Sequence, residues 1–278
     1  MTKVITHLIS DSTGETLSAI SKAVFSQFDK IELKEYIWSL VRTQSQLSKV
    51  MTTIKKKPGI IMYTLTDHEL IDVLKEECAM LNIPCMAVLD NIVSSLSKFL
   101  KVIPNPKPGK QHIIDEEYFR KIEVMNFSIT HDDGQHVDNL SCADIILVGP
   151  SRTSKSPTSM YLAHRGFKTA NVPYISGCQL PDILFKLKKP LIIGMSISPE
   201  RLVEIRKSRL LSISDHNNTE YVDRDKVTAE MLEAKKIFAV NNWSVIDITR
   251  KSIEEISATI VQLYHKKKKK QKLCLKLP

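Results

Sequence analysis

The 278-residue sequence has few aromatic residues (6%), eight glycines and five cysteines. No two cysteines stand in a Cys-x-x-Cys pair, which argues against a disulfide scaffold and a zinc site and indicates a reducing compartment. No apolar run approaches the roughly 18 residues of a membrane-spanning helix, and the first ten residues lack a signal-peptide pattern. With 42% hydrophobic and 26% charged residues, the chain can still bury a core. We therefore expect a cytoplasmic globular protein with no membrane partner.

Acidic residues are absent from the last 13 residues, which hold seven lysines. The whole chain has a net charge of +9, so the part that precedes these lysines carries only +2. We interpret residues 266–278 as a solvated basic tail. Such a tail attracts polyanions without specificity, and we predict no specific nucleic-acid partner.

Strand-like and helix-like patterns alternate along the chain. Before residue 100, strands are expected at 4–9, 33–40, 59–65 and 85–89, with helices at 15–28, between residues 40 and 59, and at 67–81. Beyond a proline-rich break at 104–109, strands are expected at 144–148, 191–195 and 245–248, and helices from about Pro157, Pro199, Asp223 and Ser252. Strands joined by helical crossovers form parallel sheets. The predicted fold is α/β, an N-terminal doubly wound parallel-sheet region followed by a P-loop kinase-like α/β domain.

The expected domain organisation has four parts. Residues 1–105 form the N-terminal α/β domain, and 106–142 connect it to a phosphotransfer domain at 143–265 that precedes the basic tail.

A phosphate-binding loop is the central motif. The apolar strand that ends at Val148 is followed by Gly149-Pro150-Ser151-Arg152-Thr153-Ser154-Lys155-Ser156 and then by a helix. This segment matches G-x-x-x-x-G-K-[ST] except that Ser154 replaces the second glycine. Backbone N–H groups of such a loop cradle phosphate, Lys155 would supply a positive charge, and Arg152 would add a second one. The Ser156 hydroxyl is the expected Mg²⁺ ligand.

Other polar clusters allow two interpretations each. His131-Asp132-Asp133-Gly134 can supply a general base or metal ligand, or be an acidic turn closed by glycine. Ser10-Asp11-Ser12-Thr13-Gly14 is either a phosphate-binding turn or a capped turn. Arg206 and Arg209 share a helix face and could contact phosphate or stay solvated, and Asp247 could be a magnesium-side acid or start a helix.

The loop and these clusters together resemble a known family, the bacterial pyruvate, phosphate dikinase regulatory proteins. The similarity covers residues 3–262 and follows the same order along the chain. Pro150 and Ser156 depart from the valine and threonine that are typical of the family; Ser156 keeps the hydroxyl, while Pro150 removes one backbone donor. The blocks that carry the resemblance are 10–14, 131–134, 149–166, 198–206 and 246–255.

This resemblance implies a bifunctional serine/threonine protein kinase and phosphorylase. Members phosphorylate a threonine of the dikinase with ADP as donor, which inactivates it, and remove the group with inorganic phosphate, releasing pyrophosphate. The implied cofactors are ADP, phosphate and Mg²⁺; the nucleotide site is Gly149 through Ser156, and the catalytic candidates are Lys155, Arg152, Asp132 and Asp133. Thr153-Ser154 and Arg165-Gly166 resemble the dikinase branch more than the related phosphoenolpyruvate synthase branch. A synthase regulator and a P-loop kinase of a small metabolite are the alternatives, and a homodimer is one option for the assembly.

Overall fold

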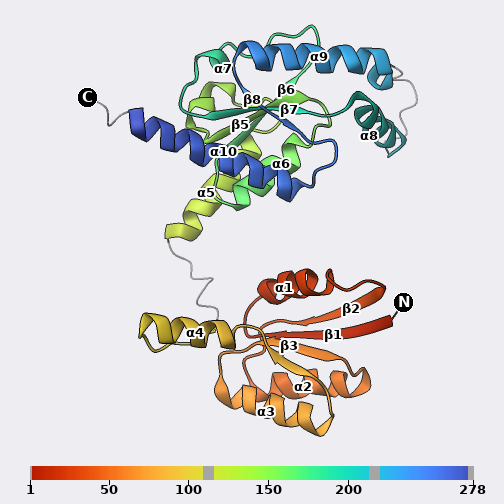
Figure 1. Ribbon diagram of the computed structural model, residues 1–278, viewed down its shortest axis with the longest axis vertical. Coiled ribbons are helices and arrows are strands. Elements are labelled where there is room, and N and C mark those ends of the chain that lie inside the picture. The colour runs from red at the N-terminus through yellow and green to blue at the C-terminus, as the bar shows by residue number, and fades with distance from the viewer. Residues whose placement is uncertain (1, 109–115, 213–219, 275–278) are drawn as a thin grey trace. The chain divides into compact units, whose positions relative to one another are not determined.

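The computed structural model describes residues 2–108, 116–212 and 220–274, with side chains up to residue 271 (Figure 1). The chain divides into two compact units, residues 1–113 and 114–278. No helix within the described ranges is long and apolar enough to cross a membrane.

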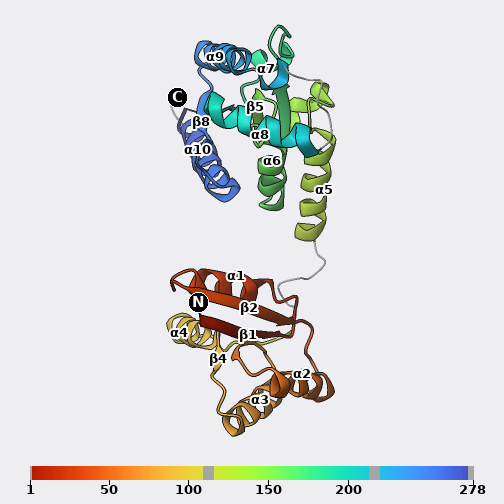
Figure 2. The same ribbon diagram turned by 90° about the vertical axis from the view of Figure 1, so that its right-hand side faces the viewer.

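The first unit is a four-stranded parallel sheet in the order β2-β1-β3-β4. Helix α1 lies on one face of this sheet, and α2 and α3 lie on the other (Figures 1 and 2). Leu8 on β1 packs with Leu17 of α1, whereas the next residue, Ile9, belongs to the core formed with α2 and α3. The elements are β1 (Thr2–Ser10), α1 (Glu15–Phe25), β2 (Ile31–Trp38), α2 (Gln44–Lys56), β3 (Ile60–Thr64), α3 (His68–Met80), β4 (Cys85–Ala87) and α4 (Asp90–Leu100).

The second unit repeats this architecture with the strand order β6-β5-β7-β8, again all parallel. Helices α6 and α10 cover one face and α9 covers the other (Figure 1). Both faces of β5 are therefore buried, and its residues form the continuous apolar run that such a strand requires. The elements are α5 (Glu116–Thr130), η2 (Val137–Cys142), β5 (Ile145–Pro150), α6 (Lys155–His164), β6 (Thr169–Tyr174), α7 (Ile183–Lys186), β7 (Leu191–Ser196), α8 (Pro199–Ser212), η3 (Glu220–Val222), α9 (Arg224–Val240), β8 (Ser244–Asp247) and α10 (Ile253–Cys274).

Local signals account for most of these boundaries, and the predicted α/β class is confirmed. Ser198 and Ser252 begin their helices as expected: each hydroxyl accepts a hydrogen bond from a backbone N–H three residues later. Helix α6 begins at Lys155, two residues earlier than the expected Pro157. The sequence pattern does not predict α4, α5, β6 or α7. Strand β6 contains Pro173, which is tolerated there because β6 lies at the edge of the sheet.

Candidate active site

The predicted phosphate-binding loop lies where the connections of the second sheet diverge. Strand β5 ends at Pro150, Ser151–Ser154 form the loop, and Lys155 begins α6. The strand after α6 pairs on one side of β5, and β7 pairs on the other side. In open α/β sheets, ligands bind at the carboxyl ends of the strands at such a divergence. The topology thus gives the motif the context that its function requires.

The backbone of the loop explains two of its residue types. Gly149 is needed for close approach, since a Cβ there would lie 2.8 Å from the Met195 carbonyl oxygen and 3.1 Å from Thr153 Oγ1. Ser154, which replaces a motif glycine, has a φ of 55°, and Arg152 has a φ of 70°. Both residues are in the left-handed region, at a cost of about 1 kcal/mol each relative to glycine. The serine therefore takes the left-handed conformation that a glycine would adopt more easily.

Lys155 is folded into the loop. Its side chain is 6% exposed, and Nζ donates a hydrogen bond of 2.8 Å to the Pro150 carbonyl oxygen. Thr153 Oγ1 donates to the same oxygen, also at 2.8 Å. Burial lowers the pKa of Lys155 to about 8, and the nearby negative charges of Asp133 and Asp132 only partly oppose this effect. An anion bound at the loop would relieve the cost of keeping this ammonium charged.

Asn171 joins the two predicted clusters. Its Nδ2 donates to Asp132 Oδ1 at 2.5 Å and to Ser156 Oγ at 2.9 Å. Its backbone N–H donates to the His131 carbonyl, and its carbonyl accepts from Gly134 N–H. These hydrogen bonds fix the acidic turn, residues 131–134, to β6 and hold it beside the predicted phosphate-binding loop. Its carboxylate and the Ser156 hydroxyl are hard oxygen ligands of the type that Mg²⁺ prefers, so this part of the site fits the metal.

Asp133 differs from its neighbour. It is exposed, with a φ of 52°, and its carboxylate takes part in no hydrogen bond or ion pair with the residues that the structure describes. Its charge nevertheless acts on Lys155. Arg152 is also exposed. The structure therefore holds one carboxylate of the pair in place and leaves the other accessible.

Arg206 supports the loop from the inside and is not a solvated helix residue. It is 3% exposed, forms an ion pair of 2.8 Å with Glu230, and donates from Nη2 to the Ser151 carbonyl at 3.3 Å. Its guanidinium also lies 4.5 Å from the centre of the Tyr221 ring. Arg209 is exposed. Arg206 therefore connects α8 and α9 to the loop, and a phosphate would have to compete with Glu230 for it.

Asp247, at the end of β8, organises a neighbouring turn. Its carboxylate accepts from the backbone N–H and from the hydroxyl of Thr249, and these bonds lower its pKa. Thr249 Oγ1 in turn accepts from Ser198 N–H. These contacts fit the local interpretation of Asp247 better than a metal-binding one.

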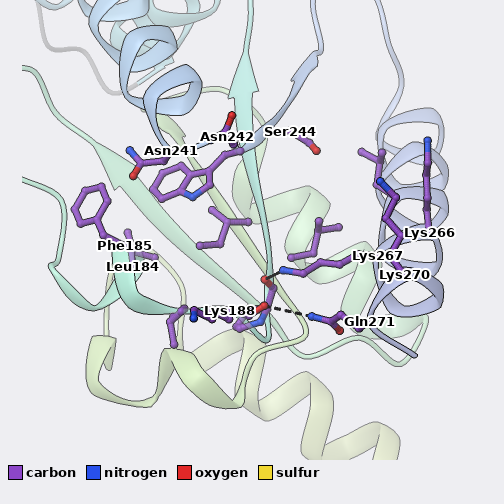
Figure 3. Close-up of a pocket in the computed structure, with 16 residues that line it drawn as sticks. Leu184, Phe185, Lys188, Asn241, Asn242, Ser244, Lys266, Lys267, Lys270 and Gln271 are labelled. Atoms are coloured by element: carbon purple, nitrogen blue, oxygen red, sulfur yellow. Dashed lines mark hydrogen bonds between the residues drawn. The ribbon is translucent and has the colours of Figure 1, made fainter. Parts of the chain in front are cut away.

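The lysine run is not simply a solvated tail. Helix α10 continues through it to Cys274, and Lys267 Nζ donates to the Pro190 carbonyl at 2.6 Å (Figure 3). A cavity of about 590 Å³ lies there, lined by Trp243 and by four lysines: Lys188, Lys266, Lys267 and Lys270. Burial, followed by the charge of Lys268, lowers the pKa of Lys267. Lys267 and Gln271 thus contact the segment that precedes β7, whereas Lys266, Lys269 and Lys270 are exposed.

Comparisons with known proteins identify the family. Residues 6–261 match the model of a family described as kinase/pyrophosphorylase. Proteins named "Putative pyruvate, phosphate dikinase regulatory protein" from Sphingopyxis alaskensis and Wolbachia pipientis are each 45% identical to this chain; both matches cover 95% of this chain and 97% of the relative. A protein of the same name from Novosphingobium aromaticivorans is 43% identical over 96% of this chain and 95% of its own. The chain therefore belongs to the kinase/pyrophosphorylase family.

Proposed function

We propose that this protein is a bifunctional serine/threonine kinase and phosphorylase that controls pyruvate, phosphate dikinase in the cytoplasm. In the forward reaction, the β-phosphoryl group of ADP passes to a threonine hydroxyl of the dikinase, giving AMP and an inactive phosphoprotein. In the reverse reaction, inorganic phosphate takes the phosphoryl group and leaves as pyrophosphate. The observation that carries the proposal is the Asn171 bridge, which sets Asp132 beside Ser156 at the start of a P-loop helix.

Charge neutralisation is the first task of the site. Lys155, Arg152 and the loop N–H groups would hold the phosphates of ADP in one direction and inorganic phosphate in the other. Lys155 is suited to both because its buried ammonium is short of negative partners until an anion arrives. One anion site can then serve both reactions.

Proton transfer is the second task, and the carboxylates of Asp132 and Asp133 have different roles. Asp132 is held next to Ser156, so these two oxygens would hold Mg²⁺, which when bound neutralises phosphate charge. Asp133 is exposed, and its carboxylate makes no hydrogen bond or ion pair with the described residues. It can therefore accept a hydrogen bond from a hydroxyl that a protein partner presents. We assign Asp133 as the group that accepts the threonine proton and returns it in the reverse reaction.

The test follows label and activity together. Active dikinase is incubated with this protein and ADP labelled in the β-phosphoryl group. We expect label on a dikinase threonine as activity falls, and labelled pyrophosphate when phosphate is added. Label only on phosphoenolpyruvate synthase would assign the chain to that regulator, and label only on a small metabolite would make it a metabolite kinase.

Three variants test the assigned roles. Asp133→Asn should reduce phosphotransfer by roughly 10²–10⁴-fold while ADP affinity is retained, as expected for loss of a general base. Asp132→Asn should instead raise the Mg²⁺ concentration needed for half-maximal rate. Asp138→Asn, an exposed carboxylate on η2, is the matched control and should leave both quantities unchanged. Near-normal rates for Asp133→Asn would remove it from the mechanism.

A further inference from the structure

The N-terminal unit contains a cavity of about 500 Å³ that the proposed reaction does not use. It lies at the carboxyl ends of β1 and β3, which end at Ser10 and Thr64. The strand after β1 pairs on one side of it, and β3 pairs on the other, so this is the divergence point of the first sheet. The cavity thus occupies the place at which a doubly wound sheet binds its ligand.

The loop from Ser10 to Gly14 presents the start of α1 to this cavity. Gly14 caps the 11-residue helix with a φ of 83°, and no side chain accepts a hydrogen bond from the first turn. Thr16, in that turn, lines the cavity. The unpaired N–H groups and the positive end of the helix dipole favour an anionic group here.

Two residues in the cavity wall, both more than nine-tenths buried, keep one side-chain oxygen without a partner among the described residues. Ser12 is 7% exposed, and its hydroxyl makes no hydrogen bond to any residue that the structure describes. Asp11 is 6% exposed; its Oδ2 accepts from Thr66 N–H at 2.9 Å and from Thr66 Oγ1 at 2.7 Å, while its Oδ1 accepts from none of the described residues. Ser12 Oγ and Asp11 Oδ1 are therefore available to a ligand that both accepts and donates hydrogen bonds.

We propose that this cavity binds a nucleoside phosphate. The phosphoryl group would accept hydrogen bonds from the first turn of α1 and from Ser12, and a ribose hydroxyl would donate to Asp11 Oδ1. The lining also includes the apolar residues Leu89, Val93 and Pro104, which suit a base, and Lys107, which supplies a positive charge. The carboxylate of Asp11 repels a bare phosphate dianion, whereas the neutral hydroxyl of a ribose can donate a hydrogen bond to it.

Equilibrium dialysis of the full-length chain with labelled ADP tests this proposal. Thr16→Glu places a negative charge at the start of α1, where a carboxylate suits the helix but repels a phosphoryl group. Ala19→Glu, on an exposed position of the same helix, is the control. Lys155→Met removes ADP binding at the P-loop, so that binding at the N-terminal site is measured by itself. Ser12→Ala is a milder second variant, and thermal unfolding verifies that each protein is folded.

We expect Lys155→Met to bind one ADP. In that background, Ala19→Glu should keep the affinity for this ADP, Thr16→Glu should lower it at least tenfold and Ser12→Ala should lower it measurably. Inorganic phosphate should displace this ADP only weakly. The proposal is overturned if Lys155→Met binds no ADP, or if Thr16→Glu in the Lys155→Met background leaves the affinity for ADP unchanged. These outcomes are independent of the proposed kinase reaction. If the P-loop does not bind ADP, the parent chain still binds one ADP, and the affinity for that ADP falls in Thr16→Glu but not in Lys155→Met.

Discussion

Replacing Lys155 by Met is expected to stabilise the ligand-free protein while removing phosphate binding at the P-loop. Burial lowers the pKa of Lys155 from 10.5 to about 8. At roughly 1.4 kcal/mol per pKa unit, the charged side chain costs the folded state about 3 kcal/mol at neutral pH. Methionine loses the hydrogen bond to the Pro150 carbonyl, worth about 1 kcal/mol, but that oxygen keeps Thr153 Oγ1 as a donor. The net expectation is a free energy of unfolding about 2 kcal/mol higher in the variant.

The pH dependence of this difference has a defined sign. Between pH 8 and 10.5 the unfolded lysine holds a proton that the folded one has released, so the wild-type protein gains stability as pH rises through this range. Lys155→Met has no such gain. Its advantage is therefore complete below pH 8 and disappears above 10.5, while all other titrating groups cancel in the comparison.

Urea unfolding followed by tryptophan fluorescence measures this effect. The chain has two tryptophans, Trp38 in the first unit and Trp243 in the second, so a Trp38→Phe background lets Trp243 report on the unit that contains Lys155. Phosphate should raise the unfolding midpoint of the background protein but not that of its Lys155→Met derivative. A variant less stable than its parent at neutral pH, or a difference that does not change with pH, would refute the reasoning.

Three further predictions follow from the same unit. Arg206→Met leaves Glu230 buried without its partner and should lower the free energy of unfolding by roughly 3–5 kcal/mol in urea titrations; a loss below about 1 kcal/mol would contradict this role. Gly194→Ala drives a Cβ into the ring of Phe238 and should cost about 1–3 kcal/mol by the same assay, whereas an unchanged midpoint would mean that the ring moves freely. Phosphate affinity at the P-loop should fall as pH rises above about 8, because Lys155 must then take up a proton on binding; calorimetry in two buffers of different ionisation enthalpy should detect that proton, and a flat pH profile would argue against it.

The sequence predicted the local features of the site but not their partners. The strand, loop and helix around Lys155 follow from hydrophobic pattern and motif, since both depend on neighbouring residues. Asn171 lies in β6, which the sequence pattern does not predict. Only the parallel pairing of β6 with β5 sets this residue opposite Leu147 and beside Ser156. The signal that the sequence offers is an asparagine within the largely apolar segment Thr169–Tyr174. Glu230, likewise, is joined to Arg206 only by the packing of α9 against α8.

By itself, the sequence determined the alternation of strands and helices, the helix starts at Ser198 and Ser252, and the phosphate-binding loop. Each of these depends on interactions within a few residues, so it can be read from a short window. The tertiary structure decided how deeply Lys155 is buried, which of the two carboxylates is held, and where Lys267 docks. Those properties depend on groups that are distant in the chain and close only after folding, and desolvation and hydrogen bonding act over those short distances in space.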